Sequence, residues 1–380
     1  MRVALVHELL TMRGGAERVL KVLATMFPEA PIYTLLYDEA KLGDWFPKER
    51  VRTSMLQPRA KLFSQFAIRN SQFAFNHHLY LPWFPTAVEK WDFSEFDLVI
   101  SSSSAFAHGI ITNGAPKHLC YVHSPARYLW DRTHDVLEQA SKGLLGDLRK
   151  TTLSCVFNRL RMWDSEAADR PDVLLAASKE VQQRIALYWR RESEVITPPV
   201  DDFWFQERRP IREQMEHGEY FLIVSTLAHY KRIDLAIRAC NELGAWLKIV
   251  GEGPDMRRLK NIAGPTIEFY GFRQLDELAD LFASARATIF PGEEDFGLVP
   301  LESMACGTPV IAYRSGGALE TIAEGETGMF FDEPTAASLQ NSLENFDRSQ
   351  FERERCREKA RVFSRERFEA SIQGAIASVI

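Results

Sequence analysis

The chain has 380 residues, of which 46% are hydrophobic and 26% are charged, and its formal net charge is −6. This length suits two hydrophobic cores better than one, and the acidic balance argues against nucleic acid as a partner, since nucleic-acid binders usually carry a basic face. The five cysteines are scattered, with no Cys-x-x-Cys pair. This spacing argues against a disulfide framework and a structural zinc site, and favours a cytoplasmic protein with reduced thiols.

Short apolar runs alternate along the chain with segments of helical period. Runs of this kind are typical of strands buried on both faces of a parallel sheet, and their alternation with helices predicts a doubly wound α/β fold. No run reaches the roughly 18 apolar residues of a membrane-spanning helix, so we expect any membrane contact to be peripheral. The predicted strands are Val3–Val6, Leu98–Ser101, Leu119–Val122, Val173–Ala176, Phe221–Val224, Leu247–Val250, Ile267–Tyr270, Thr288–Phe290 and Val310–Ala312.

A pair of prolines, Pro198 and Pro199, divides this pattern near its middle. Because proline stops regular elements and favours an extended connection, we predict a domain boundary here. The predicted organisation is an N-terminal Rossmann-like domain over residues 1–198, a second over residues 199–360, and a C-terminal helix over residues 361–380 that packs back on the first domain.

Two segments of the first domain carry candidate ligand-binding residues. Gly14 and Gly15 lie between the first predicted strand and the following helix, where glycine allows a ligand to approach the backbone near the helix N-terminus. A glycine pair is also typical of a simple turn. His123 follows the predicted strand Leu119–Val122, at the strand end where open α/β sheets bind ligands, although a purely structural histidine is the other interpretation.

The second domain carries two adjacent cations, Lys231 and Arg232, shortly after the predicted strand Phe221–Val224. Such a pair could hold a diphosphate leaving group as its charge develops, although a solvated basic pair is the alternative. Gly253, after the next strand, belongs to a Gly-x-Gly turn that lacks the third glycine of a dinucleotide fingerprint. We therefore expect a turn near a nucleotide rather than an NAD site.

The segment from Phe290 to Gly307 is the most specific of the chain. A strand ends at Phe290, a helix is predicted from Leu298, and Gly307 ends that helix. A helix N-terminus suits a diphosphate, and the carboxylates of Glu294 and Glu302 can accept hydrogen bonds from sugar hydroxyls. The alternative is that both glutamates only favour the start of the helix.

The seven residues between Glu294 and Glu302 resemble the Glu-x7-Glu signature of the family-four retaining glycosyltransferases. The resemblance implies the GT-B fold, with two doubly wound Rossmann-like domains facing across a cleft. It also implies that Glu294 contacts the transferred sugar, His123 lies beside it and Lys231 binds the diphosphate, which makes these three the candidate catalytic residues. The implied donor-binding residues are Gly15, Arg232, Gly253, Phe296, Gly297, Leu298 and Glu302.

One position departs from the family pattern. An arginine that usually precedes the phosphate-binding lysine by five residues is Thr226 here. The sequence leaves open whether Arg232 replaces that missing cation. No Asp-x-Asp pair occurs, so we expect no metal and no other cofactor, with side-chain cations and helix dipoles holding the diphosphate.

The segment from His123 to Asp131 resembles bacterial mannosyltransferases of surface-polysaccharide biosynthesis. This resemblance implies transfer of a hexose, most simply mannose from GDP-mannose, onto a lipid-linked oligosaccharide or related glycan. Basic and aromatic residues between Arg59 and Trp91 suggest a surface for an anionic membrane and a polyprenyl-diphosphate-linked acceptor, although many of the aromatic residues could belong to the core. The alternatives are a UDP-sugar-dependent enzyme of the same family, a GT-B sugar-nucleotide epimerase and a catalytically silent scaffold.

Overall fold

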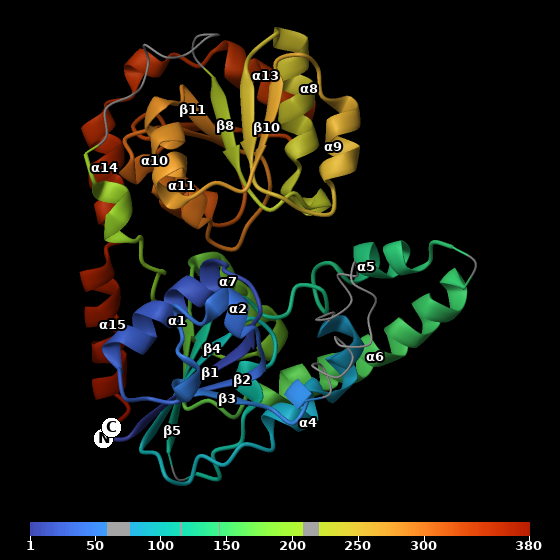
Figure 1. Ribbon diagram of the computed structural model, residues 1–380, viewed down its shortest axis with the longest axis vertical. Coiled ribbons are helices and arrows are strands. Elements are labelled where there is room, and N and C mark those ends of the chain that lie inside the picture. Colours follow the sequence, from blue (N-terminus) through green and yellow to red (C-terminus); the bar gives the residue numbers. More distant parts are fainter. Residues whose placement is uncertain (59–76, 115, 144, 208–219) are drawn as a thin grey trace. The chain divides into compact units, whose positions relative to one another are not determined.

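The computed structural model describes residues 1–58, 77–114, 116–143, 145–207 and 220–380 (Figure 1). The chain forms two units, of which the first comprises Met1–Ile196 with Glu369–Ile380, and the second Thr197–Phe368. The division after Ile196 lies two residues before the boundary that the prolines suggest, and the C-terminal segment returns to the first unit from Glu369 rather than from residue 361.

The first unit is built on a seven-stranded parallel sheet of order β3-β2-β1-β4-β5-β6-β7. Because the chain order reverses between β1 and β4, the carboxyl ends of these two strands form the switch point where open α/β sheets bind ligands. The strands are β1 Val3–Leu10, β2 Ile32–Tyr37, β3 Val51–Thr53, β4 Leu98–Ser103, β5 Lys117–Val122, β6 Val173–Ala176 and β7 Glu194–Val195.

Helices flank this sheet, and a core of aliphatic and aromatic side chains lies between them and the strands (Figure 1). Helix α1 begins after Gly14, and its apolar residues Val19, Leu20 and Leu23 are buried. The helices are α1 Gly15–Met26, α2 Glu39–Leu42, α4 Phe84–Val88, α5 Thr133–Ala140, α6 Gly146–Ala167 and α7 Lys179–Arg184, with short helical turns η1 Lys48–Arg50, η2 His77–Trp83, η3 Ala107–Gly109 and η4 Ile185–Trp189.

The second unit has a six-stranded parallel sheet of order β10-β9-β8-β11-β12-β13, with its switch point between β8 and β11. The strands are β8 Phe221–Val224, β9 Leu247–Val250, β10 Ile267–Gly271, β11 Ala287–Phe290, β12 Val310–Tyr313 and β13 Gly328–Phe331. The helices are α8 Ile233–Leu243, α9 Met256–Ile262, α10 Leu275–Ser284, α11 Leu298–Ala305, α12 Ala318–Thr321, α13 Ala336–Glu344, α14 Arg353–Arg361 and α15 Arg365–Ala377, with η5 Asp202–Phe205, η7 His229–Lys231 and η8 Arg348–Gln350. Helix α15 continues into the first unit. The doubly wound α/β prediction is confirmed for both units.

The basic and aromatic segment before Trp91 is described only from residue 77 onward, so Arg59, Lys61, Arg69 and the phenylalanines among them lie outside the described residues. In the described part, Tyr80 and Phe84 are buried in the core of the first unit, and Trp91 packs against that core. Trp83 is exposed. Most of the described aromatic residues are therefore core residues. No helix in the described parts of the chain has the length and apolarity to span a bilayer.

Candidate functional site

The switch point of the second unit brings Lys231 and Glu294 together. The neighbouring strands β8 and β11 pair in register, with Phe221 opposite Ala287, and the loops after these strands carry the two residues. The Nζ atom of Lys231 forms an ion pair with Oε1 of Glu294. Their side chains are only 14% and 24% exposed, so the pair is shielded from water without being fully buried.

The loop after β12 holds Glu294 in place. The backbone N–H of Gly317 donates a hydrogen bond to the Glu294 carbonyl oxygen over 2.9 Å. Gly316 has a φ of +60°, and a Cβ atom at Gly316 or Gly317 would collide with the backbone of Glu294 or Phe296. Ser315 Oγ also donates to Glu293 Oε2 at 3.0 Å. Because two glycines are needed for this close approach, the glycine pair after β12 positions the loop that carries Glu294.

Helix α11 begins directly after this loop. Gly297 precedes it with a φ of +87°, a left-handed conformation that favours glycine, and Leu298 is its first residue. Glu302 lies on this helix and is 3% exposed. The Phe296 side chain is 5% exposed and packs against Phe363 with ring centroids 5.6 Å apart. Because the Phe296 ring belongs to the core of the second unit, Phe296 would contact a donor through its backbone atoms.

The two predicted cations point in different directions. Arg232 has a φ of +51°, and its guanidinium lies 3.5 Å from Asp234 Oδ1 and donates to the Pro334 carbonyl oxygen. Only Lys231 of the two reaches Glu294 in the described structure. Thr226, at the position of the missing arginine, is exposed in the loop after β8, and Gly253 packs against the backbone of that same loop.

In the first unit, strand register brings His7, Ser102 and His123 together. His7 on β1 is the register partner of Ser102 on β4, and the His123 backbone N–H extends the ladder by bonding to Ser103 O at 2.8 Å. The Nδ1 atom of His7 lies 3.1 Å from both the carbonyl oxygen and Oγ of Ser102. Ser102 Oγ in turn lies 2.8 Å from Nε2 of His123. His123 is thus connected through one hydroxyl to a fully buried histidine.

Glu17 of the Gly-Gly-x-Glu sequence faces this histidine. Its Oε2 accepts the Gly14 backbone N–H at 2.9 Å, and its Oε1 lies 3.7 Å from His7 Nε2. Burial alone would lower the pKa of His7, but the hydrogen bond and negative charge of Glu17, with the charge of Glu8, raise it. Burial, together with the positive charge on His7, lowers the pKa of His123 to about 3, so His123 is neutral at physiological pH.

The last two residues of the segment from His123 to Asp131 have structural partners. Trp130 Nε1 donates to the buried Asp164 at 2.9 Å, and the Trp130 ring stacks on Tyr188 with centroids 4.9 Å apart. Asp131 pairs with Arg184 at 3.2 Å and accepts a hydrogen bond from Tyr188. Trp130 and Asp131 therefore anchor the segment to α6, α7 and η4, so these side chains carry no direct information about a bound sugar.

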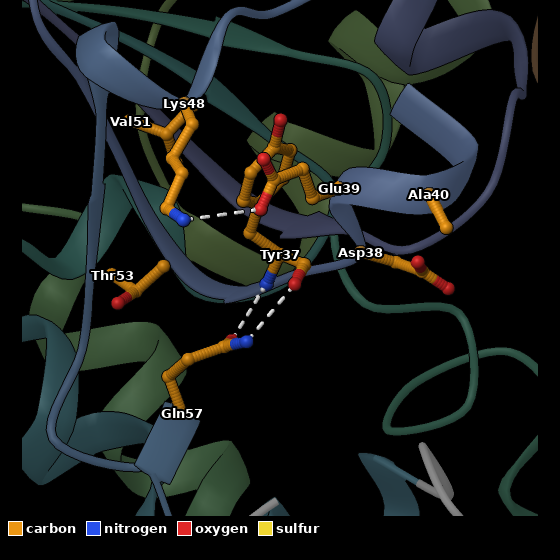
Figure 2. Close-up of a pocket in the computed structure, with 8 residues that line it drawn as sticks. All are labelled: Tyr37, Asp38, Glu39, Ala40, Lys48, Val51, Thr53 and Gln57. Atoms are coloured by element: carbon orange, nitrogen blue, oxygen red, sulfur yellow. Dashed lines mark hydrogen bonds and ion pairs between the residues drawn. The ribbon is translucent and has the colours of Figure 1, made fainter. Parts of the chain in front are cut away.

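A pocket of about 290 Å³ opens at the carboxyl end of β2 and β3 (Figure 2). Figure 2 shows the Gln57 amide bridging the backbone N–H and carbonyl of Tyr37, and Lys48 paired with Glu39 at 3.4 Å. The lining residues are Tyr37, Asp38, Glu39, Ala40, Lys48, Val51, Thr53 and Gln57. The accessible wall of this pocket is more apolar than polar, and the carboxylate, hydroxyl and ammonium groups on it could form hydrogen bonds with a bound ligand.

The sequence interpretation missed His7 and Ser102. Two signals were present: a histidine directly after the apolar predicted strand Val3–Val6, and a run of four serines, Ser101 to Ser104, at the end of another predicted strand. A polar residue in a strand buried on both faces needs a buried partner. The parallel register that makes these two residues partners was not visible in the sequence.

Comparison with known proteins shows similarity to glycosyltransferases. Residues 205–363 match the family model of glycosyl transferases group 1. The chain is 35% identical over 154 residues to a GDP-mannose-dependent alpha-(1-6)-phosphatidylinositol dimannoside mannosyltransferase of Mycobacterium tuberculosis, covering 39% of this chain and 40% of the relative. It is 31% identical over 196 residues to D-inositol 3-phosphate glycosyltransferase of Acidothermus cellulolyticus, covering 42% and 44%. The chain thus spans less than half the length of these curated relatives.

The fold extends the likeness to the whole chain. The crystal structure of Alr3699/HepE of Anabaena in complex with UDP superposes with a TM-score of 0.71, at 17% identity and with full coverage of both chains. At this identity the likeness concerns the fold, and it confirms the predicted GT-B class of two Rossmann-like units.

Proposed function

We propose that the protein, whose residues 205–363 match the family model of glycosyl transferases group 1, transfers a hexose from a nucleotide-sugar to a glycan acceptor with retention at the anomeric carbon. The observation that carries this proposal is the ion pair between Lys231 and Glu294 at the switch point of the second unit. A cation and a carboxylate at this edge supply the two chemistries that a sugar diphosphate requires, phosphate neutralisation and hydroxyl binding.

The two residues would separate when the donor binds. Lys231 neutralises the diphosphate as its bond to the anomeric carbon breaks, and Glu294, released from Lys231, accepts hydrogen bonds from sugar hydroxyls. The acceptor oxygen bonds to the same face of that carbon, and its proton passes to the departing phosphate oxygen. Glu302 is proposed to bind the ribose, and neutral His123 is proposed to bind the sugar from the first unit. We propose that this chemistry needs no metal.

The proposed donor is GDP-mannose. The mycobacterial relative named for GDP-mannose supports this choice. A UDP-sugar is the second candidate, because the fold neighbour Alr3699/HepE was crystallised with UDP. The side chains of Trp130 and Asp131 have structural partners, which weakens the argument from the His123–Asp131 segment. The donor proposal therefore depends mainly on the similarity to the mycobacterial relative.

The proposed acceptor is a lipid-linked oligosaccharide or a related glycan of polysaccharide biosynthesis, reached by a peripheral protein on the inner face of the cytoplasmic membrane. Within the first unit, we propose that the pocket beside β2 and β3 receives one acceptor sugar. Its volume of about 290 Å³ and the polar groups of Asp38, Lys48 and Thr53 support this assignment.

The experiment offers radiolabelled GDP-mannose and UDP-sugars to the protein with a lipid extract, alongside thermal shifts with GDP, UDP and ADP. A ligand that binds only the folded protein raises its apparent stability. We expect GDP to give the largest shift and GDP-mannose to label the lipid fraction. Labelling by a UDP-sugar alone would replace the donor, an epimerised donor without transfer would indicate an epimerase, and nucleotide binding without any product would indicate a silent scaffold.

A further inference from the structure

The connection between helices α5 and α6 exposes two leucines at the end of the helix pair. Leu145 and Leu148 are 59% and 65% exposed, three residues apart at the start of α6. Figure 1 shows this connection at the end of the pair that points away from the sheet of the first unit. Exposed leucines side by side on a protruding tip are unusual because neither gains stability from the fold.

Basic side chains surround these leucines. Lys142, Arg149 and Lys150 are exposed, and none has an ion-pair partner among the residues that the structure describes. Residues 142–150 carry these three positive charges against the single negative charge of Asp147, whereas the whole chain has a net charge of −6. We call Lys142, Leu145, Leu148, Arg149 and Lys150 the α5–α6 tip.

We propose that the α5–α6 tip docks on an anionic lipid surface. The leucines would enter the boundary between headgroups and acyl chains, while the three cations would contact the lipid phosphates. This inference rests on the proposed function, because a lipid-linked acceptor would lie at a membrane surface.

Charge and size favour a membrane over other partners. A second copy of the chain would bring the same cations face to face, and two leucines are far from the roughly 800 Å² per partner of a stable protein interface. A nucleic acid would use the cations but would leave the leucines exposed to water. An anionic membrane satisfies the charged and the apolar parts of the tip together.

Flotation of the full-length protein with vesicles tests the proposal. We expect binding to vesicles containing phosphatidylglycerol that weakens in high salt, and little binding to pure phosphatidylcholine. The triple variant Lys142→Gln, Arg149→Gln, Lys150→Gln should bind about a hundredfold more weakly, since each cation near an anionic surface contributes roughly a fivefold factor. The variant Leu145→Ser, Leu148→Ser should also lose binding.

Matched controls use other exposed residues of the first unit. Leu187→Ser changes a leucine that is 54% exposed on η4, and Lys21→Gln removes one exposed cation for comparison with Lys150→Gln alone. The chain already has eight tryptophans, so a Leu148→Trp variant is compared with the wild-type protein. The additional indole fluorescence should shift to the blue and be quenched by brominated lipids. Equal losses in the controls and the tip variants, or an unshifted tryptophan on bound vesicles, would overturn the proposal.

The sugar-transfer assay separates this inference from the proposed function. With acceptor dispersed in detergent, the tip variants should transfer sugar at the normal rate, and with acceptor in vesicles their rate should fall. Binding to anionic vesicles through the tip without any sugar transfer would refute the proposed function and leave the docking surface standing. Normal transfer by the tip variants on vesicles would refute the docking surface alone.

Discussion

Neutralising Glu294 should tighten the binding of a nucleoside diphosphate while nearly abolishing sugar transfer. In the ligand-free protein the Glu294 carboxylate already neutralises Lys231, so a diphosphate must displace it. In Glu294→Gln the ammonium is free to meet the phosphate, but the carboxylate that would bind the sugar hydroxyls is gone. The two effects therefore have opposite signs, and a purely structural role for Glu294 would not produce both.

The magnitude follows from the partial burial of the pair. Exposed ion pairs are worth about 0–1 kcal/mol, and breaking a fully buried one costs about 3–5 kcal/mol. With side chains 14% and 24% exposed, the pair between Lys231 and Glu294 lies between these limits. We expect GDP, or the base that binds best, to gain about 1–2 kcal/mol in Glu294→Gln, which is roughly a five- to thirtyfold lower Kd.

Calorimetric titration measures this Kd, and initial rates measure the loss of transfer. The matched control is Glu293→Gln, which removes a negative charge at the neighbouring residue. The Glu293 side chain accepts a hydrogen bond from Ser315, whereas Lys231 pairs with Glu294. Glu293→Gln should leave the Kd nearly unchanged. Weaker or unaltered nucleotide binding in Glu294→Gln, or an equal gain in the control, would refute the reasoning.

Other predictions concern the buried histidines, the glycine loop and the absence of a metal requirement. His7→Gln removes a positive charge beside His123, so the pKa of His123, which is about 3, should rise. It should stay below the ordinary value for histidine because His123 remains buried. Nuclear magnetic resonance titration of the His123 ring measures this pKa. Burial and the charge of a neighbouring histidine also lower the pKa of His118 to about 3. Between this pH and pH 6.5, His118 is therefore neutral in the folded protein and binds a proton when the protein unfolds. The free energy of unfolding should therefore decrease as the pH is lowered through this window. Denaturant titrations of His118→Gln should show a dependence of that free energy on pH that is shallower by about 1.4 kcal/mol per pH unit. Gly317→Ala should lower the free energy of unfolding by about 1–3 kcal/mol, measured by calorimetry, and lower the transfer rate, because its Cβ collides with the loop of Glu294. The control is Gly374→Ala, where a Cβ meets open space, and it should leave stability unchanged or raise it. Transfer should persist in EDTA, and a loss restored only by Mg²⁺ or Mn²⁺ would contradict the metal-independent mechanism.

Much of the fold could be predicted because parallel strands buried on both faces have a clear signal. Strands β6, β8 and β9 have the predicted ends, and each is a continuous apolar run or nearly so. Strands β2, β3, β7 and β13 were missed, and β3 and β7 are only three and two residues long. Tyr33 and Thr34 interrupt the apolar pattern of β2, and β13 is a four-residue strand that begins with Gly328, so neither has the β-branched run that predicts a buried strand.

The site was less predictable because side-chain direction depends on local backbone. The sequence placed Lys231 and Arg232 together, but the positive φ of Arg232 turns its side chain towards Asp234. Phe296 lies in the predicted loop, yet its ring enters the core. Short-range spacing indicates which loop carries a residue, whereas its orientation depends on backbone angles and packing partners that are distant in sequence. The proposed roles of Glu302 and Gly15 stay predictions.

The return of the chain to its first unit means that neither unit is a contiguous piece of sequence. Residues 197–368 are an insertion between Ile196 and Glu369, and Ile372, beyond that insertion, is fully buried. Just inside the second unit, the incoming and outgoing segments lie side by side, with the Val200 N–H bonded to the Phe363 carbonyl oxygen at 2.8 Å. A fragment ending at Ile196 would therefore lack part of its own core. A single proteolytic cut at that junction would leave two pieces that still share one folded unit, so the protein would hold together as a split, self-complementing chain.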